Sequence, residues 1–101
     1  MIVFLTKSDK KDKKYKVYLF DNAKNKTKII NFGQKGYEDY TIHKNELRKQ
    51  NYISRHKKNE DWNNPFTAGF WAYNLLWNKK TIKESIRDIE DKYDIKIIDK
   101  I

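Results

Sequence analysis

Few residues of this chain are suited to catalysis. The sequence contains two histidines, His43 and His56, and no cysteine, which excludes a thiolate zinc site and a cysteine nucleophile. Together with Asp39 and Glu60 the histidines could form a divalent-metal site, but their spacing matches no metal-binding signature. A simpler interpretation is favoured, in which His43 hydrogen-bonds a loop and His56 belongs to a basic surface. We therefore predict a protein that is not an enzyme and that binds no metal or other cofactor.

Glycines on either side of Lys35 form a second candidate site. The segment Gly33-Gln34-Lys35-Gly36 could let backbone N–H groups converge on an anion. It lacks the Ser/Thr and the spacing of a P-loop, so nucleotide hydrolysis is not expected. A plain turn is the favoured interpretation, and a phosphate contact at Lys35 is the alternative.

Positive charge is the strongest chemical signal. The chain has 23 Lys and Arg against 14 Asp and Glu, a net charge of +9 at pH 7. Residues 1–58 hold 16 basic and 6 acidic residues (+10), and residues 59–101 hold 7 and 8 (−1). Such a field attracts polyanions, of which nucleic acids are the commonest inside cells. A membrane surface is not the expected partner, because the bulky aromatic residues lie in the near-neutral half; the remaining alternative is that lysine only confers solubility.

The candidate phosphate contacts gather around one basic segment. A helix expected from about Glu46 to Lys58, with Asn45 as its N-cap, places Arg48 and Arg55 two turns apart on one side. Neighbouring aromatic rings could stack on bases, although core packing accounts for them equally well. The candidate binding residues are Lys35, Tyr37, Tyr40, His43, Lys44, Arg48, Arg55, Lys57, Lys58 and Trp62, with Lys10 to Lys14 as a mobile polycation arm. We expect sequence-independent backbone contacts, to DNA in preference to RNA.

Residues 1–36 are expected to form three antiparallel strands. Apolar or alternating runs cover residues 2–5, 15–20 and 27–32. The lysine-rich loop 7–14 contains no apolar residue and joins the first two runs. These residues therefore predict a three-strand meander.

Residues 37–94 are expected to be helical after an ordered loop at 37–44. The helix from about Glu46 has a thin apolar stripe, made of Leu47, Tyr52 and Ile53. Asn64 and Pro65 are placed to open a second helix that reaches Trp77, is apolar nearly all round, and buries Phe70, Trp71 and Trp77. A capping box at Thr81–Glu84 opens a third, amphipathic helix with Ile82, Ile86, Ile89 and Tyr93 on one face.

Residues 95–101 are expected to be an edge strand or a frayed tail. The whole chain, residues 1–101, is thus predicted to be a single α+β domain with a small antiparallel meander and about three helices. The apolar start, Met1 to Leu5, is too short for a signal peptide or a membrane span. With no cysteine, we expect a soluble, unprocessed protein of a reducing compartment.

Two strings in the helical part are unusual, Thr67-Ala68-Gly69-Phe70-Trp71 and Leu75-Leu76-Trp77-Asn78-Lys79. With further matches between Asn31 and Ser85, among them Phe32-Gly33, Asp39 to Lys44 and Arg55-His56, the chain resembles a family of small basic proteins of large nucleocytoplasmic DNA viruses, including giant and algal viruses. The chain departs from that family at Lys80, where proline is expected. The resemblance implies a viral protein in the host-cell cytoplasm or nucleus, or in the virion, and implies no activity.

Two hypotheses follow. The first is a nucleic-acid-binding accessory protein whose contacts are mainly to phosphates. The second is a virion structural or protein-interaction module that docks on another viral protein through the aromatic segment, which an exposed Trp71 or Trp77 would favour.

Overall fold

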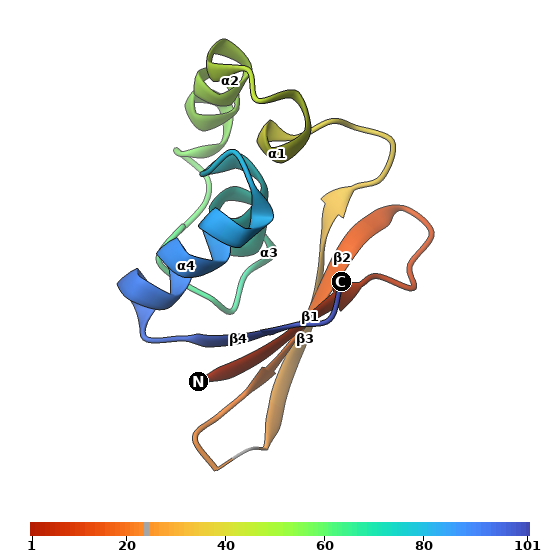
Figure 1. Ribbon diagram of the computed structural model, residues 1–101, viewed down its shortest axis with the longest axis vertical. Coiled ribbons are helices and arrows are strands. Elements are labelled where there is room, and N and C mark those ends of the chain that lie inside the picture. Colours follow the sequence, from red (N-terminus) through yellow and green to blue (C-terminus); the bar gives the residue numbers. More distant parts are fainter. Residues whose placement is uncertain (24) are drawn as a thin grey trace.

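Alternating apolar side chains build a four-stranded sheet. The computed structural model describes residues 1–23 and 25–101, and its strands lie in the order β3-β2-β1-β4 (Figure 1). The strands are β1 (Ile2–Lys7), β2 (Lys13–Phe20), β3 (Lys26–Gln34) and β4 (Lys96–Asp99). β1, β2 and β3 pair antiparallel, so the predicted meander is confirmed.

The C-terminal segment forms an edge strand, the first of the two alternatives expected for residues 95–101. β4 pairs with β1 in the parallel direction, with Val3 opposite Ile97. The sheet is therefore mixed and not purely antiparallel, because the helical part carries the chain across to run β4 alongside β1.

The core lies on one face of this sheet. Val3, Leu5, Val17 and Leu19 are fully buried, as period-two alternation requires. Figure 1 shows the helices on that side of the sheet, and α3 and α4 contact β3 and β4 respectively. The helical segments are α1 (Tyr40–His43), α2 (Glu46–His56), α3 (Ala68–Trp71), the π-helix η1 (Ala72–Trp77) and α4 (Ile82–Tyr93).

α1 lies inside the segment that was expected to be a loop. Asp39 caps it, because its carboxylate accepts a hydrogen bond from the Thr41 amide, and Lys44 ends it in the left-handed region with φ 54°. The loop prediction for residues 37–44 is therefore wrong over Tyr40–His43. A single turn of helix has too little periodicity to be visible in the sequence.

α2 begins as predicted and differs in its buried face. Asn45 is the N-cap, and its side chain accepts a hydrogen bond from the Arg48 amide. Tyr52 is buried, but Leu47 is 70% exposed, so Leu47 does not belong to the apolar stripe. The helix ends at His56, two residues before the predicted end.

The central helix starts later than predicted and changes its hydrogen-bonding pattern. Thr67 is the N-cap of α3, whereas Asn64 closes the preceding turn by accepting from the Phe66 amide. From Ala72 the helix continues as η1, a π-helix. Buried Asn74 donates its side-chain amide to the Phe70 carbonyl at 3.0 Å, which competes with the i−4 backbone bond of an α-helix.

α4 confirms the capping box and the amphipathic pattern. The Thr81 hydroxyl accepts from the Glu84 amide at 3.1 Å, and Ile89 is fully buried. Phe70 and Trp71 are fully buried in the same core, as predicted. Within residues 1–23 and 25–101, none of the helices has the length and apolar character needed to cross a membrane.

Candidate nucleic-acid interface

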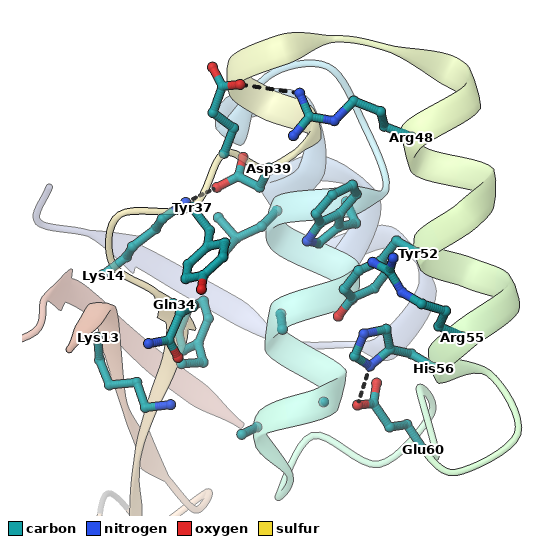
Figure 2. Close-up of a pocket in the computed structure, with 18 of the residues that line it drawn as sticks. Lys13, Lys14, Gln34, Tyr37, Asp39, Arg48, Tyr52, Arg55, His56 and Glu60 are labelled. Carbon is teal, nitrogen blue, oxygen red and sulfur yellow. Dashed lines mark hydrogen bonds and ion pairs between the residues drawn. The ribbon is translucent and has the colours of Figure 1, made fainter.

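A cleft of about 790 Å³ lies between the sheet and α2. Figure 2 shows Lys13, Gln34 and Tyr37 on the sheet side, and Arg55 and His56 of α2 on the opposite side. Small residues and aromatic rings form the rest of the lining, among them Ala68, Gly69, Ala72, Phe32 and Trp77. The cleft therefore has polar, cationic walls and a floor that leaves room for a ligand.

Each acidic side chain of the cleft contacts a basic side chain. Lys14 contacts Asp39 at 2.8 Å, and this pair is largely buried. Arg48 contacts Glu38 at 3.1 Å, and His56 contacts Glu60 at 3.1 Å (Figure 2). The buried carboxylate, Asp39, is thus compensated by the Lys14 ammonium group.

Two cations of the cleft remain without such a partner. Among the residues that the structure describes, Lys13 and Arg55 have no acidic group within 4.0 Å. Arg48 joins them readily, because the Arg48 and Glu38 side chains are 48% and 56% exposed and such a pair contributes at most about 1 kcal/mol. A phosphate could therefore bind at all three positions.

Aromatic stacking holds α2 against η1 behind the cleft. The Tyr52 ring lies 4.3 Å from that of Trp77 and 4.2 Å from that of His56, with interplanar angles of 7° and 21°. Trp62 and Tyr73 form a second stack, with ring centroids 3.9 Å apart. Burial raises the pKa of Tyr52 well above its ordinary value, so its hydroxyl stays neutral. These stacks fix the wall that carries Arg55.

Three of the predicted binding residues are engaged in contacts within the fold and are not free to bind a ligand. Tyr40 is 4% exposed, and its hydroxyl donates to Glu46 at 2.8 Å. Trp62 is partly buried in its stack, and its Nε1–H donates to Glu60 at 2.8 Å. Neither ring has the free face that a base requires, so we remove both from the candidate interface.

His43 is the third. Its Nδ1 accepts a hydrogen bond from the Asn45 amide at 2.9 Å, and its ring lies 5.3 Å from that of Trp77. Burial lowers the pKa of His43, which favours the neutral ring. This supports the loop-bonding interpretation of His43, and a neutral ring adds no charge for a phosphate.

The other predicted residues are exposed, but they do not form one cluster. Tyr37, Arg48 and Arg55 line the cleft. Lys57 and Lys58 follow the C-terminal end of α2, and the remaining two lie in the turn after β3 and at the end of α1: Lys35 and Lys44. The structure thus brings together three of the ten candidates.

The lysine-rich segment is not a mobile arm as a whole. Lys13 and Lys14 belong to β2, and Lys14 is bound to Asp39. The Lys13 amide donates to the Lys10 carbonyl at 3.3 Å, which closes a turn. Sequence reasoning missed the cleft position of Lys13, because no local pattern shows that the start of β2 faces α2.

The glycine segment, residues 33–36, forms a plain turn, which is the interpretation that the sequence favoured. Gly33 has φ +79°, which disfavours any side chain, and a Cβ atom there would lie in tight contact with Leu76 Cδ1, at 3.0 Å. The Tyr37 amide donates to the Gln34 carbonyl, and the Lys35 amide donates to the Asp12 carbonyl. With that amide engaged, the segment is not an open anion-binding loop.

The proposed metal ligands lie in separate pairs. Glu60 contacts His56, whereas Asp39 contacts Lys14. Across the part of the chain that the structure describes, no group of three or more His, Asp or Glu side chains could hold a metal ion.

Residues 3–56 match a family of unknown function, DUF5754. The chain belongs to this family. It matches no curated protein and no solved structure. The DUF5754 segment runs from β1 to the end of α2, so it includes Lys13, Arg48 and Arg55 on both walls of the cleft. The part of the floor that α3 and η1 build lies outside the matched segment.

Proposed function

We propose that this protein binds nucleic acid through its phosphate backbone, with α2 and the adjoining cleft as the contact surface. One observation carries the proposal: Arg48 and Arg55 face the same cleft as Lys13, and the buried carboxylate there, Asp39, is paired with Lys14. Two exposed lysines, Lys57 and Lys58, extend the positive surface beyond α2.

The chemistry of these side chains suits phosphate. A guanidinium group donates two parallel hydrogen bonds to phosphate oxygens and does not lose its charge at neutral pH. Seven residues of α-helix span about 10 Å, so Arg48 and Arg55 would contact different phosphates. The net charge of +9 adds long-range attraction, which speeds encounter with a polyanion.

The competing hypothesis, docking on another viral protein through the aromatic segment, has less support. Trp71 is fully buried, and Trp77 is partly buried and stacked on Tyr52. The segment therefore lacks the exposed tryptophan that would anchor a protein interface. Our proposal includes DNA in preference to RNA, and the viral setting that the resemblance implies: host-cell cytoplasm or nucleus, or virion.

The test is a fluorescence-anisotropy titration with single-stranded DNA, duplex DNA and RNA at several salt concentrations. Heparin serves as a control that carries charge without nucleotide structure. We expect submicromolar binding whose log affinity falls with log salt by about 0.7–0.9 per phosphate contacted. Absence of binding at moderate salt, or equal preference for heparin, would overturn the proposal and favour a protein partner.

A further inference from the structure

The second face of the sheet is not covered by helices. Figure 1 shows the helices on the opposite side. In the strand register Phe4 lies opposite Tyr18, and Ile2 lies opposite Phe20. These four side chains alternate with the buried residues of β1 and β2 and lie outside the core cluster, and each is partly exposed. We call this surface the outer sheet face and define it by Phe4, Tyr18, Phe20, Lys16, Lys26 and Lys96.

Its aromatic rings lie on the two central strands. Phe4 belongs to β1, and Tyr18 and Phe20 belong to β2. The ring centroids of Phe4 and Phe20 are 5.2 Å apart. Same-face residues on one strand are about 7 Å apart, and the Phe4 and Phe20 planes are tilted by 54°, so the platform consists of separate rings at the spacing of neighbouring bases. Aromatic rings on an open four-stranded sheet are a common stacking surface for unpaired bases.

The charges of this face fit a polyanion. Lys16 Nζ lies 4.9 Å and Lys26 Nζ lies 6.0 Å from the centre of the Tyr18 ring. Lys96 pairs in register with Ile2 at the other side of the face. Among the described strand positions on this face, all the charged residues are lysines.

One carboxylate approaches from outside the strands. Asp9, in the hairpin between β1 and β2, contacts Lys16 at 3.2 Å, and its side chain is 81% exposed. The Lys16 side chain is 13% exposed, whereas Asp9 lies at the surface, so a phosphate that reaches Lys16 has to displace this carboxylate. A second copy of the chain fits this face poorly, because stacking two such faces would bring lysines together.

We infer that the outer sheet face stacks the bases of a single-stranded nucleic acid. The inference rests on the proposed function and adds a second contact surface, on the side of the sheet away from the α2 cleft. Bases in a duplex are stacked on each other and have no free ring face for a flat sheet, whereas the bases of a single strand do. The lysines beside Tyr18 would hold the phosphates next to the stacked bases.

The test compares two oligomers with the same number of phosphates. One is a labelled oligodeoxythymidylate, and the other is an abasic oligomer of equal length. We expect the wild-type protein to bind the thymidylate at least about tenfold more tightly, because each stacked base adds affinity that phosphates cannot supply. Equal affinity for both would overturn the inference and leave phosphate binding standing. No binding of either would overturn the proposed function itself.

Two variants locate the platform. Phe4→Leu and Tyr18→Leu keep an apolar side chain and remove a ring. We expect each to lower thymidylate affinity toward that of the abasic oligomer, with no change in abasic binding. The matched control is Phe66→Leu, an exposed phenylalanine that precedes α3, on the helical side of the molecule. An equal loss in the control, or unchanged affinity in both platform variants, would contradict the assignment.

Discussion

Replacing Arg48 and Arg55 together by alanine removes the two guanidinium groups of the cleft wall. If each contacts one phosphate, the slope of log affinity against log salt falls by about 0.7–0.9 for each, or about 1.4–1.8 in total. If the variant and the wild type bind equally at 1 M salt, this slope change corresponds to a loss of affinity of about 25- to 60-fold at 0.1 M salt and of only about 4- to 5-fold at 0.4 M. The dependence of the loss on salt is the signature of lost phosphate contacts.

The fold should tolerate this double substitution. Both arginines are exposed, and the Arg48–Glu38 pair contributes at most about 1 kcal/mol. Alanine also has the highest helix propensity. Circular dichroism and the urea midpoint would verify that the variant is folded before its affinity is compared.

The assay is fluorescence anisotropy with a labelled DNA strand at four salt concentrations. A control variant, Lys83→Ala with Arg87→Ala, also removes two positive charges, from exposed positions of α4. Because the control changes only the overall field, its slope should remain close to that of the wild type. A slope that falls equally in both variants, or in neither, would refute the assignment of phosphate contacts to α2.

Three further predictions concern the framework of the fold. Thr81→Ala removes the N-cap of α4 and should lower the free energy of unfolding by about 1 kcal/mol in urea denaturation; an unchanged midpoint would contradict this. Gly33→Ala places a Cβ atom at φ +79° against Leu76 and should cost more than about 1 kcal/mol, visible as a lower melting temperature. Because burial lowers the pKa of His43, and its Nδ1 accepts from Asn45, the unfolded chain binds this proton more readily than the folded protein. Stability should therefore fall as pH drops below about 6.5, and His43→Gln should reduce that fall in urea midpoints measured between pH 8 and pH 5; an identical pH profile would exclude His43 as the cause.

Local signals were enough to predict the meander and two helix starts. Apolar and polar side chains alternate along the strands, and turn residues mark where each strand ends. Asn45 and Thr81 precede their helices, and each side chain caps the backbone amide three residues later. The start of the central helix was misplaced, because Asn64 and Thr67 are both good N-caps and only the folded structure selects Thr67.

Tertiary contacts determined the features that the sequence could not reveal. The π-helix depends on where the buried Asn74 amide finds its acceptors, and the burial of Tyr40 depends on Glu46 in the next helix. The candidate site shows the same limit. The basic face with Arg48 and Arg55 follows from helical periodicity, but its convergence with Lys13 on one cleft requires the whole fold.

The most direct test of nucleic-acid binding at these surfaces is an ¹H–¹⁵N correlation spectrum of the labelled protein, recorded while a short single-stranded DNA is added. We predict shift changes concentrated in α2 near Arg48 and Arg55, at Lys13, and on β1 and β2 around Phe4 and Tyr18, with α4 largely unaffected. Absence of shifts, or shifts concentrated on α4, would contradict the proposed nucleic-acid interface.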